Sequence, residues 1–332
     1  MTRAVRVLSG TDLSTLLTLA DVIAAVESAY VAASRQQALL YPVIREPLKD
    51  SGGVFGIKSG YWPGEHSLGL KVAGYWPGNR AQGLENHQAM VVLVEPSTGV
   101  PRTIIDGNFV TAIRTSAAGA IGLRHLARPD SENALIVGTG VQAAAQARAL
   151  HWWRPGMNVE VFEPLDTGDR PATLAFCRRL ADIGIACRPC GPVEDAVLKS
   201  DVVITTTPAR IPVVHRDWLT SGVHVNAMGS DTAGKQEHEV ATLRDSVVVV
   251  DDWGQASRLG ECQHAVAEGL YSDQEHPSSI GQVIAGEAPG RQDSHQMTFF
   301  DATGLALQDL ATAELAARTA EERQAGTIIQ LD

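Results

Sequence analysis

The segment that most constrains the fold lies between residues 134 and 150. Apolar residues 134–137 lead into Gly138-Thr-Gly140-Val-Gln-Ala143, and an Ala-rich stretch of helical character follows. In a strand, turn and helix of this kind, Gly138 permits the tight turn, Gly140 lets the backbone approach a pyrophosphate, and Ala143 lets the helix pack close to the strand. Free N–H groups and the dipole at the start of the helix favour the negative pyrophosphate. The pattern therefore predicts a dinucleotide-binding turn.

Short apolar strands alternate with helices on both sides of this turn. We expect helices over 111–127, from the turn to about 152, and over 171–184. The expected strands are 134–138, 158–163, 201–207, 222–228 and 246–251. Apolar strands that alternate with helices indicate a parallel sheet covered on both faces. The predicted fold class is therefore α/β, with a Rossmann-type domain over residues 113–304.

The residues before this domain follow a different pattern. An amphipathic helix is expected over 20–33, and strands over 56–61 and 68–73. Residues 90–95 and 102–106 flank a Pro/Gly turn, which predicts a β-hairpin. We expect a second α/β domain over 1–112 with a mostly antiparallel sheet, and a C-terminal helix within 305–332 that packs back on it.

The second predicted strand of the Rossmann domain ends in a carboxylate. Glu163 lies 25 residues after Gly138, near the position where an acid hydrogen-bonds the adenosine ribose. A carboxylate there repels a 2′-phosphate, and the next residues, Pro164-Leu165-Asp166, offer no Arg to accept one. The expected cofactor is therefore NAD(H) rather than NADP(H).

Charge and composition exclude several classes of partner. Lys and Arg number 27 against 38 Asp and Glu, which gives a net charge of −11. A nucleic-acid binder needs the opposite sign over its binding surface. No run approaches the roughly 18 apolar residues that span a bilayer, and the first residues lack the pattern of a signal peptide. We expect a cytoplasmic protein with neither nucleic acid nor membrane as a partner.

The cysteines do not indicate a metal site. Cys187-Arg-Pro-Cys190 is a lone CxxC, and Cys177 and Cys262 do not complete a second pair. We expect four reduced thiols in this compartment. No His, Cys, Asp or Glu spacing matches a metal-ligand motif, so no metal is expected.

Several motifs together resemble the ornithine cyclodeaminase/μ-crystallin family over nearly the whole chain. They are Leu68-Gly-Leu-Lys71, Pro77-Gly-Asn79, Gly83-Leu-Glu-Asn86-His87-Gln88, Thr111-Ala-Ile-Arg114-Thr115, Val137-Gly-Thr-Gly-Val-Gln142, Thr205-Thr206-Thr207-Pro208 and Gly229-Ser230-Asp231-Thr-Ala-Gly-Lys235. The resemblance implies a substrate-binding and dimerisation domain before the Rossmann domain, and a homodimer.

The resemblance also implies roles for single residues. Lys71 and Asp231 are expected to be catalytic, Asp231 as the carboxylate beside the nicotinamide. Arg45, Lys71 and Arg114 match cations that hold the substrate α-carboxylate, with Asn86 and His87 beside them. The positions expected to contact the dinucleotide are Thr115, Gly138, Thr139, Gly140, Val141, Gln142, Glu163, Thr206, Thr207, Met228, Gly229, Ser230 and Lys235.

One position departs from the family pattern. Relatives that accept ornithine carry a carboxylate on the strand before the Lys71 strand, and an ungapped alignment places Lys58 there. A cation in place of an acid reverses the preference at the distal end of the substrate. Arg45, Lys58, Lys71 and Arg114 would give four fixed positive charges, which suit a dicarboxylate. If Lys58 instead points to solvent from the other face of its strand, this argument fails.

These features together predict an NADH-dependent imino-acid reductase. The expected small-molecule substrate is a 2-imino dicarboxylate such as iminosuccinate, which would give L-aspartate. The alternatives are an ornithine-type cyclodeaminase that releases ammonia, an amino-acid dehydrogenase similar to alanine dehydrogenase, and a non-catalytic binder in which the dinucleotide only shapes a ligand site. Retention of both Lys71 and Asp231 argues against the last of these.

Overall fold

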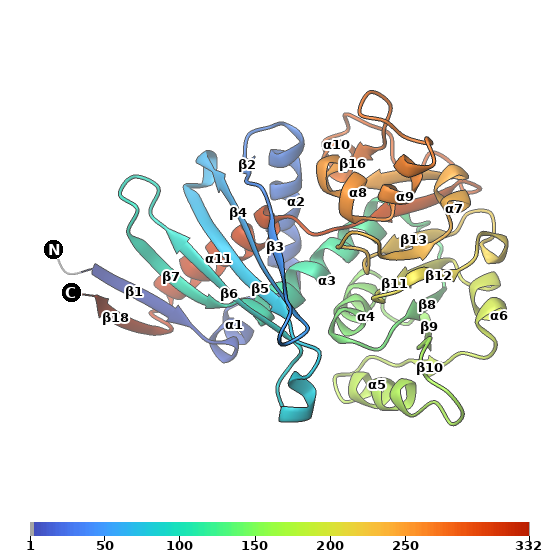
Figure 1. Ribbon diagram of the computed structural model, residues 1–332, viewed down its shortest axis with the longest axis horizontal. Coiled ribbons are helices and arrows are strands. Elements are labelled where there is room, and N and C mark those ends of the chain that lie inside the picture. Colours follow the sequence, from blue (N-terminus) through green and yellow to red (C-terminus); the bar gives the residue numbers. More distant parts are fainter. Residues whose placement is uncertain (1–2, 332) are drawn as a thin grey trace. The chain divides into compact units, whose positions relative to one another are not determined.

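The computed structural model describes residues 3–331 and divides the chain into two compact units (Figure 1). Unit 1 runs to Arg114 and resumes at Leu305, and unit 2 runs from Thr115 to Gly304. The boundaries proposed from the sequence, 112/113 and 304/305, lie within two residues of this division. The mixed α/β class with a parallel sheet is as predicted.

Unit 1 is built on a largely antiparallel sheet. Its elements are β1 (Arg3–Leu8), α1 (Gly10–Leu16), α2 (Leu19–Ser34), β2 (Leu39–Leu40), β3 (Ile44–Leu48), β4 (Gly53–Trp62), η1 (Pro63–Glu65), β5 (Ser67–Tyr75), η2 (Asn79–Gln82), β6 (His87–Val94), β7 (Pro101–Asp106), the start of α3 (Gly107–Leu126), α11 (Ala306–Glu322) and β18 (Thr327–Leu331). The sheet order is β18-β1-β7-β6-β5-β4-β2, and β3 pairs with β4. Only β1 and β7, within the described chain, pair in parallel here.

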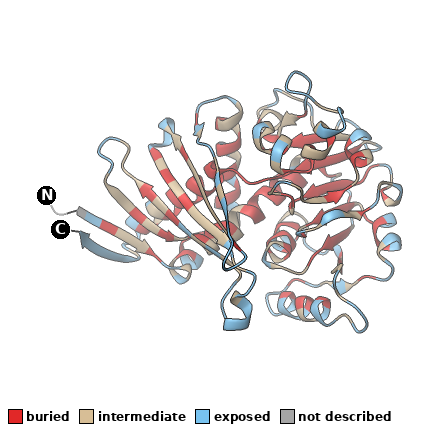
Figure 2. Ribbon diagram, viewed as in Figure 1, coloured by how far each residue is buried: buried red, intermediate tan, exposed pale blue. Residues whose placement is uncertain are grey.

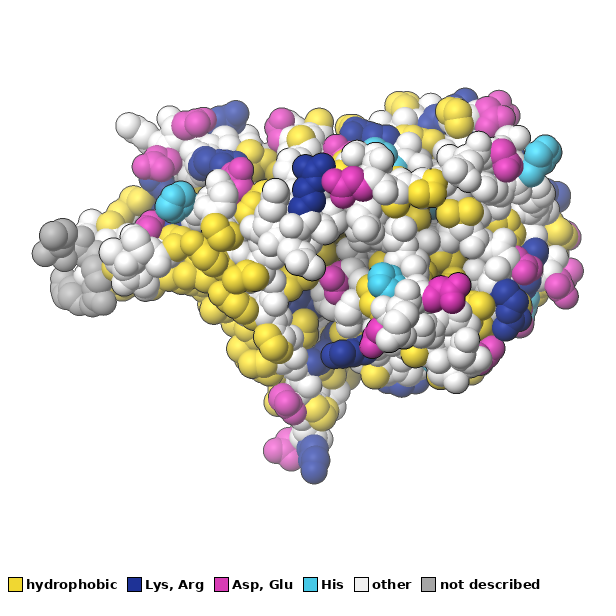
Figure 3. Space-filling model, turned by 90° about the horizontal axis from the view of Figure 1, so that it is seen from above, with side chains coloured by type: hydrophobic (Ala, Val, Ile, Leu, Met, Phe, Trp, Pro, Cys, Tyr) yellow, Lys and Arg dark blue, Asp and Glu magenta, His cyan; other side chains and the backbone are white. Residues whose placement is uncertain are grey.

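One face of this sheet is covered by helix and the other is open. Helix α11 packs on β4, β5 and β6, and α2 packs on α11. Side chains alternate across the sheet, so Val91 and Ile105 are buried while their neighbours Val92 and Ile104 are only half-buried (Figure 2). The half-buried face is nevertheless apolar, and Figure 3 shows a broad group of hydrophobic side chains over the strands of unit 1.

Unit 2 contains the parallel sheet that the sequence predicts. Its elements are β8 (Asn133–Val137), α4 (Val141–Trp153), β9 (Asn158–Phe162), α5 (Pro171–Ala181), β10 (Arg188–Pro189), α6 (Val193–Leu198), β11 (Val202–Thr205), β12 (Arg210–Val214), η3 (Arg216–Trp218), β13 (His224–Ala227), β14 (Gln236–His238), α7 (Val240–Arg244), β15 (Ser246–Val250), α8 (Trp253–Leu259), α9 (Cys262–Ala267), β16 (Ser278–Ser279), α10 (Ile280–Ile284) and β17 (Met297–Asp301). The sheet order is β10-β9-β8-β11-β13-β17-β15-β16, with every pairing parallel.

The direction of the strand order changes between β8 and β11. The chain passes from β8 outward to β9 and β10, and then returns to β11 on the other side of β8. In open α/β sheets, ligands bind outside the carboxyl ends of the strands at this switch point. The turn after β8 is the predicted dinucleotide turn, so the sheet places that turn where a ligand would bind.

The structure contains strands that the sequence pattern did not indicate. β17 lies between β13 and β15 and is fully buried, although its apolar run is short and follows a long polar stretch. β1 and β18 form an edge of the unit 1 sheet, and their pairing joins the two ends of the chain. Such pairings depend on residues distant in sequence, which local periodicity does not report.

No single helix within residues 3–331 is long and apolar enough to cross a membrane. Helices α1 and α2 reach that length and apolar content only when taken together, and the pair is bent by 91°. Its apolar side chains, Leu13, Val22 and Val26 among them, lie in the core of unit 1.

Candidate functional site

Strand register brings the predicted cationic residues of unit 1 to one face of its sheet. Lys58 on β4 lies directly opposite Lys71 on β5, and Arg45 lies opposite Gly56, two residues from Lys58. His87 pairs with Tyr75, which lies four residues after Lys71 and therefore on the same face. This is the face that α11 covers. Lys58 therefore does not point away from Lys71.

A buried carboxylate that the sequence analysis did not identify joins two of these cations. Asp309 on α11 accepts a hydrogen bond from Lys71 Nζ at 2.7 Å, and its Oδ1 lies 3.2 Å from Arg114 Nε. Lys71 also donates to Thr111 Oγ1 at 3.2 Å. The side chains of Lys71 and Asp309 are only 4% and 1% exposed. We name Lys58, Lys71, Arg114 and Asp309 the cation cluster.

The charges of the cation cluster act on one another. Burial lowers the pKa of Lys71 to about 7; Asp309 opposes this shift, whereas Arg114 and Lys58 reinforce it. Burial by itself raises the pKa of Asp309, but Lys71, Arg114 and Lys58 bring it below its usual value. Two lysines directly opposite each other on a sheet repel, so their placement costs stability. The half-buried cations Lys58 and Arg114, beside the buried Lys71–Asp309 pair, are suited to binding an anion.

This geometry corrects the count of fixed positive charges expected from the sequence. Asp309 neutralises one positive charge, and burial lowers the pKa of Lys71, so its charge is not fixed. Arg45 lies on the same face of the sheet as Lys58 and Lys71.

A signal for Asp309 was present in the sequence. Ala306, Leu310 and Ala313 share the buried face of α11, and Asp309 lies on that face at helical spacing. A carboxylate on an otherwise apolar, buried helix face needs a cationic partner. The partner is 238 residues away along the chain, so the sequence pattern alone could not name it.

The two residues predicted beside the cations have different surroundings. His87 Nδ1 lies 3.0 Å from Asn108 Oδ1, and burial together with the charges of Lys71 and Arg114 lowers the pKa of His87. Asn86 donates to Tyr75 and accepts from the backbone of Arg80, so its side chain supports the loop before β6. His87 thus belongs to the electrostatic environment of the cation cluster, and Asn86 shapes the loop next to it.

In unit 2, the turn after β8 fits an anionic dinucleotide. Gly138 has a φ of +114°, and a Cβ there would lie 2.5 Å from Thr206 Oγ1, so the position needs glycine. A Cβ on Gly140 would meet no described atom within 4 Å, which leaves open space in front of α4. No described side chain caps this helix, and Gln142 Oε1 is buried without a hydrogen-bond partner among residues 3–331. Open space and uncapped N–H groups are what a pyrophosphate requires.

Glu163 is oriented by this turn. It follows β9, and its Oε2 accepts a hydrogen bond from Thr139 Oγ1 at 2.8 Å. The hydroxyl therefore holds the carboxylate beside the turn, next to the expected position of the adenosine ribose. Val141, also expected to contact the dinucleotide, is the first residue of α4 and is 46% exposed.

Two buried glutamates hold the loops that follow β11 and β13. Glu237 on β14 accepts hydrogen bonds from Thr207 N at 2.5 Å, Thr207 Oγ1 at 2.7 Å and Gly229 N at 3.0 Å. Glu261 accepts from Ser230 Oγ and from the backbone N–H groups of Glu237 and His238. Burial raises the pKa of both carboxyls. We call Glu237 and Glu261 the loop clasp; the sequence analysis did not identify either residue.

The loop clasp engages hydroxyls that the sequence analysis assigned to the cofactor. The side chains of Thr207 and Ser230 turn inward to Glu237 and Glu261, so their backbone is the part that remains to face a ligand. Gly229 must be glycine, because a Cβ would lie 2.5 Å from Glu237 Oε2. Met228 is buried, and Thr206 donates its hydroxyl to the carbonyl of Val137.

Asp231 follows these residues at the carboxyl end of β13. Its Oδ1 accepts from Lys235 Nζ at 2.7 Å and from Thr232 Oγ1 at 3.0 Å, and the side chain is 37% exposed. Lys235 also donates to the carbonyl of Gly229. Lys235, expected at the dinucleotide, therefore orients Asp231.

Thr115, another residue expected to contact the dinucleotide, is buried at the start of unit 2, and its carbonyl accepts a hydrogen bond from Gln146.

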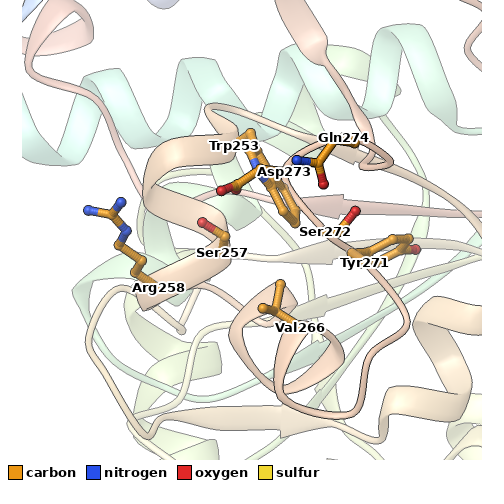
Figure 4. A pocket seen from close by; sticks show the side chains of 8 residues that line it. All are labelled: Trp253, Ser257, Arg258, Val266, Tyr271, Ser272, Asp273 and Gln274. Atoms are coloured by element: carbon orange, nitrogen blue, oxygen red, sulfur yellow. The ribbon is translucent and has the colours of Figure 1, made fainter.

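A separate hollow in unit 2 contains none of the predicted residues. It has a volume of about 440 Å³ and is lined by Trp253, Tyr271 and Asp273 among others (Figure 4). Trp253 stacks on His276 and donates to Asp273, so its ring is already packed. Within the described part of the chain, no group of three or more His, Cys, Asp or Glu side chains is arranged to hold a metal.

The chain is similar in sequence and overall fold to several known proteins. The model of the ornithine cyclodeaminase/mu-crystallin family matches residues 4–324. The iminosuccinate reductase of Paracoccus denitrificans is 33% identical over 316 residues, which cover 94% of this chain and 95% of the relative. Its crystal structure in complex with NAD+ superposes with a TM-score of 0.89, covering 99% of this chain and 100% of that one, at 31% identity.

Two further solved structures are similarly close. An archaeal alanine dehydrogenase dimer with bound NAD superposes with a TM-score of 0.90 at 32% identity, covering 99% of this chain and 100% of that one. The Delta(1)-pyrroline-2-carboxylate reductase of Thermococcus litoralis, in complex with NADH and L-proline, superposes with a TM-score of 0.90 at 30% identity. The superposition covers 97% of this chain and 99% of that one. These likenesses span both units.

Proposed function

Because the chain belongs to the ornithine cyclodeaminase/μ-crystallin family, we propose that it is an NADH-dependent imino-acid reductase that acts on a 2-imino dicarboxylate. Iminosuccinate is the substrate of this class that we favour, and its reduction gives L-aspartate. The observation that carries the choice is Lys58, directly opposite Lys71 on the face that also holds Arg114 and Asp309. The relative named iminosuccinate reductase supports it.

Charge balance in the cation cluster supports a dianionic substrate. Asp309 offsets one of the positive charges of Lys58, Lys71 and Arg114, and Arg45 lies on the same face, so positive charge predominates when Lys71 is protonated. A dicarboxylate brings two negative charges, and charge-assisted hydrogen bonds to both carboxylates would fix its orientation. A diamino acid would place an ammonium beside Lys58, and like charges in such a site reject a ligand.

The residues have distinct roles in the proposed reaction. Lys71 and Arg114 would bind the α-carboxylate, and Lys58 the distal carboxylate, with Arg45 and His87 on the same face. Gly138, Gly140 and the N-terminus of α4 would hold the pyrophosphate, and Glu163 the ribose. When bound, NADH supplies the hydride that reduces the C=N bond. Asp231, held by Lys235, would protonate the imine nitrogen, directly or through a water, or stabilise its positive charge.

Two supporting proposals concern the state of the protein. We infer a homodimer, because the open face of the unit 1 sheet is apolar and the related alanine dehydrogenase is described as a dimer. The acidic composition and the reduced cysteines are in keeping with a cytoplasmic enzyme.

The decisive experiment is an NADH oxidation screen with purified protein. Oxaloacetate with ammonia, which form iminosuccinate in solution, should consume NADH much faster than pyruvate with ammonia. 1-Pyrroline-2-carboxylate tests the cyclic imine, and ornithine with NAD+ tests ammonia release without net NADH turnover. A preference for pyruvate would favour an alanine dehydrogenase, and ammonia release from ornithine would favour a cyclodeaminase. Either result would overturn the dicarboxylate assignment.

A further inference from the structure

Two thiols of unit 2 lie closer together than the sequence spacing suggests. Cys177 is on α5 and Cys187 is in the segment just before β10, and their sulfur atoms are 3.0 Å apart. Both are free thiols, and Cys187 donates its S–H to Cys177. The CxxC partner, Cys190, is buried, and its Sγ donates to the carbonyl of Gly191. The proximal pair is therefore Cys177 and Cys187, not the two cysteines of the CxxC.

We propose that Cys177 and Cys187 form a modification site, at which a hydroperoxide converts the two thiols into a reversible disulfide. A disulfide needs its sulfur atoms about 2.05 Å apart, so the pair must close by only about 1 Å. The donated S–H stabilises a thiolate on Cys177, which lowers the pKa of that thiol, whereas the pKa of Cys187 is raised. The thiolate is the nucleophile in such chemistry.

The reaction balances with a hydroperoxide as the oxidant. The Cys177 thiolate attacks one peroxide oxygen, the O–O bond breaks, and a sulfenic acid forms with loss of hydroxide or alkoxide. The Cys187 sulfur then attacks the Cys177 sulfur, the S–O bond breaks, and water leaves with the proton of Cys187. Both sulfur atoms are oxidised and the two peroxide oxygens are reduced. Cys187 is the more exposed of the two and completes the disulfide.

The pair is linked to the dinucleotide turn through α5. Arg179, two residues after Cys177, donates to the carbonyl of Thr139 at 3.3 Å, and Asp166 accepts from Thr173 near the start of the same helix. A disulfide would draw α5 toward Cys187 and lengthen the contact of Arg179 with the turn. That hydrogen bond holds the turn that would contact NADH. If its contribution to the order of the turn is lost, the affinity for NADH should change by the worth of one hydrogen bond, about two- to ten-fold. We therefore expect the oxidised protein to bind NADH more weakly by that factor.

Thiol counting and peptide mapping test the disulfide on the wild-type protein. The native protein is treated with hydrogen peroxide, quenched with an alkylating agent and denatured. Two of its four thiols should be lost, one peptide pair should join Cys177 to Cys187, and dithiothreitol should restore all four. A disulfide between Cys187 and Cys190, or retention of four thiols while the protein stays folded, would overturn the proposal.

Serine variants test the roles of the two sulfurs. Cys187→Ser should accumulate a sulfenic acid on Cys177 that dimedone labels, and Cys177→Ser should form no disulfide. Cys190→Ser is the matched control and should still lose two thiols. Dimedone labelling at Cys187 in the Cys177→Ser protein, with none at Cys177 in the other, would reverse the assigned order. An unchanged Kd for NADH in the oxidised wild type would overturn the link to the dinucleotide turn.

Discussion

Lys71 is a buried lysine whose charge changes near neutral pH. Burial brings its pKa to about 7, well below the value of about 10.4 for an exposed lysine. Because the folded-state pKa lies below the unfolded one, the charge of Lys71 costs folding free energy in full below pH 7. That cost is relieved as pH rises from 7 toward the unfolded value. Anion binding has the opposite requirement, because it needs the protonated form.

This opposition predicts that dicarboxylate affinity falls as pH rises. Succinate, a stable dianion, should inhibit competitively, with a Ki that rises above about pH 7 by up to tenfold per pH unit. Asp309→Asn removes the charge that supports protonation of Lys71, so the rise should begin at lower pH. The measurement is the Ki of succinate for the wild type and for Asp309→Asn between about pH 6 and pH 9. A flat Ki in the wild type would show that the charge of Lys71 does not control binding.

Lys58 is predicted to determine the choice of substrate. Its charge-assisted hydrogen bond to the distal carboxylate is worth about 1.5–3 kcal/mol, or roughly 10–150-fold in kcat/KM. Lys58→Ala should penalise the imino dicarboxylate by that factor and barely affect an imino monocarboxylate of similar length. Lys58→Glu should reject the dicarboxylate more strongly. Steady-state kinetics at saturating NADH provide the measurement.

The control for Lys58 is Lys49→Ala, an exposed lysine of the same unit, which should leave both activities unchanged. Equal losses on the two substrate classes in Lys58→Ala would assign Lys58 to folding rather than to selectivity. No loss on either class would remove it from the substrate site.

Glu163 is predicted to exclude NADPH. A carboxylate against a 2′-phosphate costs several kcal/mol, so Glu163→Ala should improve the kcat/KM for NADPH relative to NADH by more than about tenfold. Glu160→Ala, three residues earlier on β9 and paired with Arg188, is the matched control and should not change the ratio. A wild type that already prefers NADPH would contradict this role.

At the scale of elements, β14 and the residue before α9 stabilise the loops that carry the site of unit 2. Glu237 joins Thr207, after β11, to Gly229, after β13. Glu261 precedes α9 and holds Ser230 together with the backbone of β14. Asp231 follows Ser230 directly, so the loop clasp fixes the backbone from which the proposed catalytic carboxylate projects. We therefore expect Glu237 to act as a positioning residue.

Removal of Glu237 should therefore slow the reaction without contact with substrate. A displacement of a reacting group by about 1 Å can lower the rate by about 10²-fold, so Glu237→Ala should lower kcat by about that factor. Asp231→Asn, which removes the proposed acid itself, should lower kcat to a similar extent. Glu237→Gln keeps an acceptor for Thr207 but presents an N–H₂ group to Gly229 N–H, and should lose about tenfold. kcat, KM and thermal unfolding are measured together. If the Glu237→Ala protein is folded and its kcat is normal, Glu237 contributes to the stability of the fold and not to the positioning of Asp231.

At the scale of the whole molecule, the open face of the unit 1 sheet is where we expect a second copy. Leu70, Val92 and Ile104 are neighbours across β5, β6 and β7 on that face and are only partly buried in the single chain. Adjacent apolar side chains exposed over several strands are typical of a protein interface.

A single charge on this face should separate the copies. Val92→Asp would bury a carboxylate at the interface at a cost of several kcal/mol, so the dimer dissociation constant should rise by about 10² or more. Light scattering after size exclusion measures the mass, and NADH binding shows that unit 2 remains folded. Ile211→Asp, at a residue of β12 that is 74% exposed, is the control. A wild type that is monomeric at high concentration would refute the interface.

The sequence alone determined the features that local pattern encodes. The strand, turn and helix around Gly138 and Gly140, the parallel strands of unit 2 and the hairpin of β6 and β7 follow from periodicity and from glycine and proline placement. The charges of Glu163 and Lys58 could also be interpreted from the sequence. Glu163 follows a strand at the position expected beside the ribose, and Lys58 lies on a strand where relatives that accept ornithine carry an acid. These features depend on residues near one another in the chain.

Only the tertiary structure decided which side chains meet. Lys58 faces Lys71 because of the register between β4 and β5, and Asp309 reaches Lys71 across 238 residues of sequence. The loop clasp similarly depends on Glu237 and Glu261 reaching loops that other strands deliver. A helix or strand pattern identifies the face on which a residue lies, whereas its partner is fixed by how faces pack. Packing therefore decided the charge of the cation cluster, because a buried carboxylate on α11 offsets one of the cations that the sequence displays.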